Sequence, residues 1–145
     1  MKLSVVAVGR VKEAPVRALL DEYRSRLIHY APLRETEIDD GSPETLAARI
    51  TKIAKGDVLV ALDSRGRQYD SHEFARFVET LGRQGKGNVC FALGGKEGLG
   101  APTLDQAAHV LSLGKMTLPH RLARVVLYEQ LYRAMTILRG EPYGL

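Results

Sequence analysis

The sequence contains few of the residues that mark a disulfide scaffold or a metal centre. Its 145 residues include one cysteine, Cys90, and no tryptophan. A single cysteine cannot form an internal disulfide, so we expect a reducing compartment and a cytoplasmic location, with Cys90 as a small buried residue of a strand. The four histidines do not have the spacing of zinc ligands. We therefore expect no metal cofactor.

Long hydrophobic runs and the motifs of several enzyme classes are also missing. No apolar stretch approaches the roughly 18 residues that a membrane span requires, and the first residues suit a strand rather than a signal peptide. There is no Gly-x-Ser-x-Gly nucleophile elbow, which disfavours a hydrolase of the triad type. There is no phosphate-binding P-loop either, which disfavours a mononucleotide-binding protein.

What the sequence does contain suits one globular domain over residues 1–145. Hydrophobic residues make up 45% and charged residues 26%, and a chain of this length buries about 70% of its unfolded surface. The net charge of +4 is unevenly distributed, because residues 115–145 hold five lysines and arginines against two glutamates. Such an excess favours a polyanion such as RNA, although a solvated helix face explains the charge equally well.

Segments typical of strands and helices alternate along the chain. Strands are expected at residues 2–9, 33–39, 57–62, 88–93 and 109–113. Helices are expected at residues 16–27, from the Ser42-Pro43-Glu44 start to 54, from a Ser71 cap to 82, and at 104–108 and 121–139. This alternation predicts an α/β fold with a mostly parallel sheet and helices on both faces, while the strand order stays open.

The helix expected at residues 121–139 is apolar most of the way round. A helix of this kind is buried on more than one side. In a chain this short, a second copy is a plausible partner, so we predict a C2 homodimer. The alternative is a helix buried deep within one chain.

Two loops near the carboxyl end are the strongest candidates for a ligand site. Residues 94–100 (GGKEGLG) and 113–120 (LGKMTLPH) each follow an expected strand. Ligands of parallel α/β folds bind at the carboxyl ends of the strands, and glycines let a backbone approach a ligand closely. The spacing is not that of a dinucleotide fingerprint, and a tight structural turn is the alternative reading.

A third candidate is the segment Asp63-Ser64-Arg65-Gly66-Arg67, read as a turn after the third strand. Two arginines at a sheet edge suit a phosphate. A plain polar turn is the slightly favoured alternative.

Five segments together resemble one bacterial family over essentially the full length. They are MKLSVVAVG at 1–9, VALD at 60–63, LGGKEGL at 93–99, TLPHRLARVVLYEQLYRAMTI at 117–137 and PY at 142–143. The family is that of the SPOUT-class methyltransferases called large-subunit ribosomal RNA methyltransferase H. The resemblance implies a SPOUT fold with a C-terminal trefoil knot and a homodimer. It also implies methyl transfer from S-adenosyl-L-methionine to N3 of a pseudouridine in 23S rRNA of the assembled ribosome.

The resemblance also assigns residues. Cofactor contacts fall on Leu62, Gly94, Gly95, Leu113, Gly114, Lys115, Met116, Thr117 and Leu118. Two departures stand out: Lys96 replaces the usual proline of the glycine loop, and Gly144 and Leu145 follow Tyr143 where the family has a histidine and a basic residue. That family tail reaches toward the active site of the dimer partner.

Methyl transfer to an imide nitrogen requires alignment of the acceptor and stabilisation of its anion. We expect a positive environment from Arg65, Lys115, Arg121 and Arg124, and no residue is assigned as the base. Arg124 and Tyr143 are the catalytic candidates, in positioning roles: Arg121 or Arg124 contacting an RNA phosphate, and Tyr143 closing over the base. The alternatives are a SPOUT methyltransferase acting on transfer RNA and a non-catalytic RNA-binding module.

Overall fold

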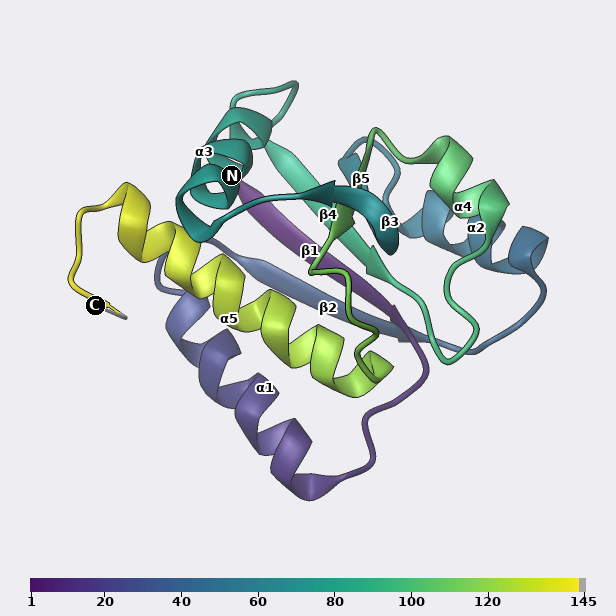
Figure 1. Cartoon of the computed structure of the whole chain (residues 1–145). Helices are drawn as coiled ribbons and strands as arrows, with labels where there is room; N and C mark the ends of the chain where they lie inside the picture. Colours follow the sequence, from purple (N-terminus) through teal and green to yellow (C-terminus); the bar gives the residue numbers. More distant parts are fainter. Residues whose placement is uncertain (144–145) are drawn as a thin grey trace.

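Five strands and five helices alternate along residues 1–143, which are the residues that the computed structural model describes (Figure 1). The strands are β1 (Lys2–Val8), β2 (Leu33–Ile38), β3 (Val58–Gln68), β4 (Asn88–Leu93) and β5 (His109–Ser112). The helices are α1 (Ala14–Leu27), α2 (Pro43–Ile53), α3 (Ser71–Gly82), α4 (Ala101–Gln106) and α5 (His120–Leu138).

The strands form one parallel sheet in the order β2-β1-β4-β3-β5. Helices α1, α3 and α5 cover one face, and α2 and α4 cover the other (Figure 1). The predicted α/β fold with helices on both faces is therefore confirmed. The trefoil knot stays a prediction.

Each face of the sheet has its own hydrophobic core. Successive side chains of a strand point to opposite faces, so β1 sends Leu3 and Val5 into the core beneath α1, α3 and α5. The same strand sends Val6 and Val8 into the core beneath α2 and α4. A strand covered on both faces reads as a continuous apolar run, which is why β1 and β4 could be located from sequence.

The starts of two helices test the predicted caps. The Ser42 hydroxyl accepts a hydrogen bond from the Thr45 N–H at 3.1 Å, as expected for the residue before Pro43. The predicted Ser71 cap of α3 is wrong, because Asp70 occupies that position. Asp70 and Glu73 form a capping box, in which each side chain accepts the other residue's backbone N–H.

Strand β3 corrects the interpretation of residues 63–67 as a turn. The strand continues to Gln68 with a shift in register between Leu62 and Arg67. Gly66 permits this continuation, because a Cβ there would lie 2.6 Å from the backbone carbonyl of Val110 in β5. The absence of a side chain thus lets the two strands stay together past the irregularity.

Helix α5 lies between α1 and α3, and this arrangement accounts for much of its apolar surface (Figure 1). Leu127, Tyr128 and Leu131 are fully buried, whereas Leu122 is 41% exposed. The alternative of burial within one chain therefore explains most of this helix, and the homodimer stays a prediction. Within residues 1–143, no helix has the length and hydropathy needed to cross a membrane.

Candidate active site

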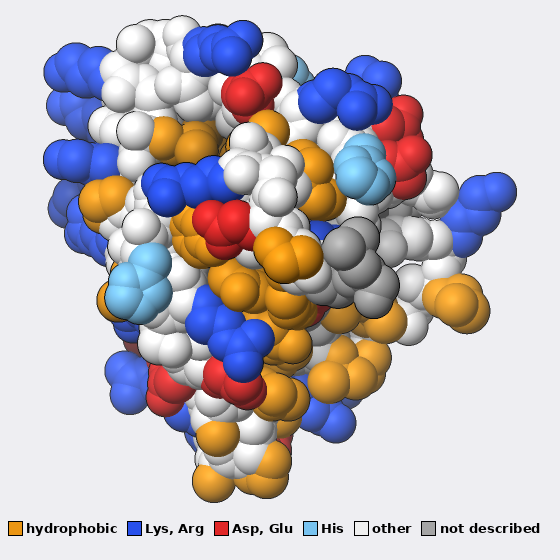
Figure 2. Space-filling model, turned by 90° about the vertical axis from the view of Figure 1, so that its left-hand side faces the viewer, with side chains coloured by type: hydrophobic (Ala, Val, Ile, Leu, Met, Phe, Trp, Pro, Cys, Tyr) orange, Lys and Arg blue, Asp and Glu red, His pale blue; other side chains and the backbone are white. Residues whose placement is uncertain are grey.

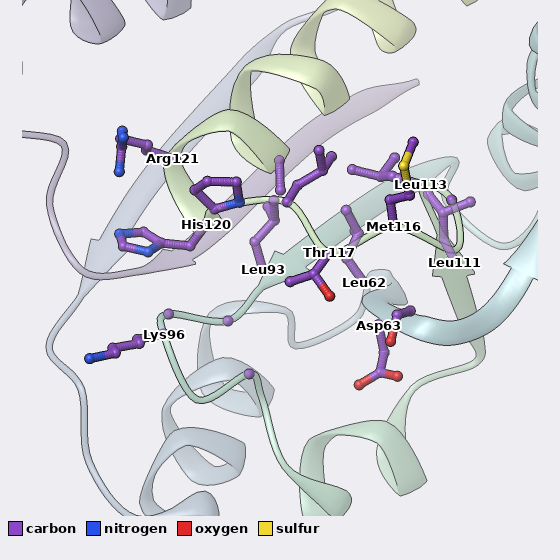
Figure 3. A pocket seen from close by; sticks show the side chains of 18 residues that line it. Leu62, Asp63, Leu93, Lys96, Leu111, Leu113, Met116, Thr117, His120 and Arg121 are labelled. Carbon is purple, nitrogen blue, oxygen red and sulfur yellow. The ribbon is translucent and has the colours of Figure 1, made fainter.

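A cavity of about 710 Å³ lies at the carboxyl edge of the sheet, where the two predicted loops meet. Its apolar floor comes from three neighbouring strands. Leu62 of β3 pairs with Leu111 of β5, and the pairing of Ala61 with Ala92 brings Leu93 of β4 alongside. Parallel strands that end at one edge thus place three leucines side by side beneath the loops (Figure 3).

The glycine loop forms one wall of the cavity. The Gly98 N–H donates to the Gly95 carbonyl at 3.1 Å, which closes a tight turn. A Cβ on Gly94 would lie 2.4 Å from the carbonyl carbon of Gly98, so a side chain at position 94 does not fit this turn. Leu99 is only 1% exposed and anchors the end of the loop in the core beneath α2 and α4.

The segment that leads from β5 into α5 forms the opposite wall. The Ser112 hydroxyl donates to the Gly114 carbonyl at 3.0 Å and accepts from the Gly114 N–H at 3.2 Å, which fixes the turn after the strand. Met116 and Leu118 line the cavity and remain 84% and 38% exposed. This wall therefore offers backbone groups and exposed apolar side chains to a ligand.

Eight of the nine predicted cofactor residues line this cavity. They are Leu62, Gly94, Gly95, Leu113, Gly114, Met116, Thr117 and Leu118. Lys115 is exposed but does not belong to the lining. The sequence interpretation missed the apolar lining residues Leu93, Leu111 and Ala123, although the strand-end positions of the first two were a usable signal.

The ionisable side chains of the cavity lie at its two ends (Figure 3). Lys96, His120 and Arg121 lie at one end, and Asp63 lies at the other. The Arg65 guanidinium binds both carboxylate oxygens of Asp63, at 2.9 and 3.2 Å, and this holds the Asp63 pKa below its ordinary value. Arg65 therefore neutralises Asp63 and does not supply the free positive charge expected of it.

Arg124 corrects a second expectation. Arg124 is only 3% exposed, and its Nη2 lies 2.6 Å from Glu37 Oε2 and 3.4 Å from Glu35 Oε1. Two carboxylates thus occupy a guanidinium that solvent does not reach, so of the two alternatives for the phosphate contact, Arg121 or Arg124, the exposed Arg121 is the one we retain. A catalytic role for Arg124 through positioning stays a prediction.

Glu35 and Glu37 connect helix α5 to α1 and β2. Glu35 accepts a hydrogen bond from the Tyr128 hydroxyl and pairs with Arg17 Nη1 at 3.0 Å. Burial raises the pKa of Glu35, but hydrogen bonds from Arg17 and Tyr128 and the nearby Arg124 charge outweigh it, so the net shift is downward. Tyr128 consequently has a raised pKa through burial and its bond to Glu35, and remains protonated.

Tyr143 lies away from the cavity of its own chain. Its hydroxyl donates to Glu129 at 2.9 Å, and its ring packs edge-on against Tyr132 beneath the Arg133 guanidinium. Burial and the bond to Glu129 raise its pKa. The expected closure of Tyr143 over the substrate base therefore stays a prediction that requires a partner's cavity. Gly144 and Leu145 lie outside the described residues.

Comparison with known proteins first identifies the class of protein to which this chain belongs. The family model described as "Predicted SPOUT methyltransferase" matches residues 1–144. Two solved structures share the fold: a probable methylase family protein from Haemophilus influenzae Rd KW20, and the SpoU methyltransferase AviRb from Streptomyces viridochromogenes in complex with the cofactor AdoMet. The first has a TM-score of 0.60 at 12% identity over 99% of this chain and 70% of that one. The second has a TM-score of 0.52 at 16% identity over 97% and 59%.

Curated relatives narrow the assignment. A protein named "Ribosomal RNA large subunit methyltransferase H" from Sorangium cellulosum (strain So ce56) is 47% identical over 99% of both chains. A protein of the same name from Koribacter versatilis (strain Ellin345) is 46% identical over 99% of this chain and 97% of that one. The chain thus belongs to the SPOUT methyltransferase family, within the group of proteins named ribosomal RNA large subunit methyltransferase H, and the resemblance seen in the sequence is confirmed.

Proposed function

We propose that this chain, acting as one SPOUT domain over residues 1–145, methylates N3 of a pseudouridine in 23S rRNA of the assembled ribosome in the cytoplasm. The methyl donor is S-adenosyl-L-methionine. The name of the curated relatives supports large-subunit ribosomal RNA as the substrate. The observation that carries the proposal is the cavity enclosed by residues 94–98 and 113–121 at the carboxyl edge of the sheet.

The cavity suits the proposed cofactor. Its volume of about 710 Å³ lies within the range of small-molecule sites. Leu62, Leu93 and Leu111 offer apolar surface to the adenosyl group, and the irregular loops offer backbone hydrogen-bonding groups. The holding residues are the eight predicted ones that line the cavity. When bound, the cofactor supplies an electrophilic methyl group on a sulfonium.

The chain's own contribution is positioning and electrostatics. N3 of the acceptor base must lose a proton to accept a carbon, and nearby cations stabilise the anion that results. Lys96 and Arg121 place this positive charge at one end of the cavity, beside His120. Asp63, at the other end, is neutralised by Arg65 and does not oppose that charge.

We also propose that the enzyme works as a C2 homodimer. Figure 2 shows hydrophobic side chains open to solvent around the C-terminal end of the chain. Tyr143 packs against the carboxyl half of α5, whereas the cavity lies at the start of that helix, so Tyr143 can serve only the cavity of a partner. Light scattering of the purified protein tests this, and a monomeric mass at working concentration would contradict it.

Two measurements test the proposed function and its alternatives. Isothermal calorimetry with S-adenosylmethionine should show binding, whereas the absence of heat would favour a non-catalytic RNA-binding module. Ribosomes and transfer RNA are then incubated separately with enzyme and labelled cofactor, and the modified nucleosides are identified by mass spectrometry. Label on 23S rRNA alone supports the proposal, and label on transfer RNA alone supports the related enzyme.

A further inference from the structure

The positive end of the cavity consists of side chains without a partner. Lys96, His120 and Arg121 are all exposed, and no side chain within residues 1–143 forms an ion pair or hydrogen bond with any of them. Two neighbouring arginines of α5 differ, since Arg124 pairs with Glu37 and Arg133 pairs with Glu129. Within the described residues, two exposed cations without an ion pair, Lys96 and Arg121, thus lie beside His120 where the helix meets the cavity.

Further positive charge lies beside this end. Val8 at the end of β1 lies next to Gly95, because a Cβ on Gly95 would be 3.3 Å from the Val8 side chain. The segment after β1 carries the exposed residues Arg10 and Lys12. Glu37 Oε2 holds this segment near α5, since it accepts both the Val11 N–H at 3.1 Å and Arg124 Nη2 at 2.6 Å.

The other charged groups do not cancel this potential. Glu97 follows Lys96 in the same loop, but it is exposed and does not line the cavity. The first turn of α5 has no side-chain cap, so its free backbone N–H groups add positive potential beside His120 and Arg121. The one carboxylate of the proposed cofactor is too little negative charge for Lys96, Arg121 and the nearby Arg10 and Lys12, whereas an RNA backbone supplies a phosphate at every nucleotide.

We propose that Lys96, His120 and Arg121 bind the phosphate backbone of the RNA beside the acceptor nucleotide. This inference rests on the proposed function. Lys96 sits on the turn closed by Gly98 and Gly95, so its stem starts from a fixed backbone.

A matched pair of lysine substitutions tests the proposal. Lys96→Gln and Lys86→Gln each remove one exposed lysine from a loop, but only Lys96 lines the cavity, since Lys86 precedes β4 and the cavity lies at the carboxyl end of that strand. The probe is ribosomes purified from cells that lack this methylation, and affinity is measured over a series of salt concentrations. Lys96→Gln should weaken binding about tenfold, and its logarithmic salt slope should fall by about 0.7 to 1, the loss expected for one phosphate contact. Lys86→Gln should match the unmodified enzyme.

The outcomes separate this inference from the proposed function. If the unmodified enzyme binds no S-adenosylmethionine and methylates no ribosome, the proposed function fails. If it does both and Lys96→Gln retains the full salt slope, only the phosphate contact is overturned. Calorimetry should give equal cofactor affinity for both lysine variants, and a loss confined to Lys96→Gln would assign Lys96 to the cofactor instead.

Discussion

Arg121 and Arg124 lie three residues apart on α5, yet their surroundings are opposite. Arg121 is exposed at the edge of the cavity and has no carboxylate partner within residues 1–143. Arg124 is 3% exposed and lies between Glu35 and Glu37. Residues three apart on a helix are neighbours on its surface, so the difference comes from their surroundings. The cavity mouth lies beside Arg121, whereas carboxylates of β2 enclose Arg124 one turn further along.

This difference shows why a count of charge could not locate the RNA-binding surface. The basic excess of residues 115–145 includes Arg124 and Arg133, which carboxylates of the same chain neutralise. What remains for an external anion is Arg121 at the mouth of the cavity, together with Lys115 and Arg139, which are exposed but do not line it. The two environments predict different consequences for substitution at each position.

The largest effect is expected for Arg124→Leu. Removing the guanidinium leaves Glu35 and Glu37 without it in a partly buried site, which should lower the free energy of unfolding by about 3 kcal/mol. Arg121→Leu is the matched control and should change this quantity by less than about 0.5 kcal/mol. Urea denaturation measures both, and equal losses would remove the distinction between the two arginines.

The second prediction compares two adjacent glycines. Gly94→Ala should weaken cofactor binding at least about tenfold, because its Cβ would meet the Gly98 backbone at 2.4 Å and the loop would have to open. Gly95→Ala should have a smaller effect, since its Cβ would approach only the Val8 side chain, at 3.3 Å. Calorimetry with S-adenosylmethionine compares the two, and a stronger effect at Gly95 would contradict the prediction.

The fold could be predicted where local sequence decides structure. Apolar runs located β1 and β4, and the Ser42-Pro43 start located α2. The length of β3 was missed because it depends on pairing with β5, a contact across more than 40 residues that no local pattern records. The polar composition of residues 63–67 is typical of a turn, and only the sheet neighbour makes it a strand.

The candidate site, like the fold, could be predicted from the sequence only in part. Glycine-rich and irregular loops after strands identified the cavity walls, since parallel strands end at one edge. The role of Arg124 could not be predicted, because its partners Glu35 and Glu37 lie almost 90 residues away on β2. Tyr143 presents the same problem, since its position depends on how α5 directs the end of the chain.

The pH dependence of stability tests the role of Glu35, which pairs with the buried Arg124. Its pKa in the folded protein lies below the ordinary value of 4.5, so its stabilising contribution is present above that pH and is lost as the pH falls through the lower folded-state value. Glu35→Gln should therefore cost about 1.5 kcal/mol near neutral pH, where it loses charged hydrogen bonds to Arg17 and Tyr128. The difference in the free energy of unfolding between Glu35→Gln and the unmodified protein should become smaller at acid pH. A difference that stays constant as the pH is lowered would contradict the assigned pairing.

The smallest perturbation is a test of thiol reactivity, which compares strand β4 with the glycine loop that follows it. Cys90 is 0% exposed, and burial raises its pKa to about 11, so it should react slowly with a thiol reagent in the folded protein. A cysteine introduced by Lys96→Cys, six residues further along, should react at the rate of a free thiol because position 96 is exposed. Mass spectrometry of the labelled variant distinguishes the two sites. Equal labelling of both sites under native conditions would contradict the prediction. It would mean that β4 opens together with the glycine loop, so that the strand beneath the cavity is as accessible to the reagent as the loop.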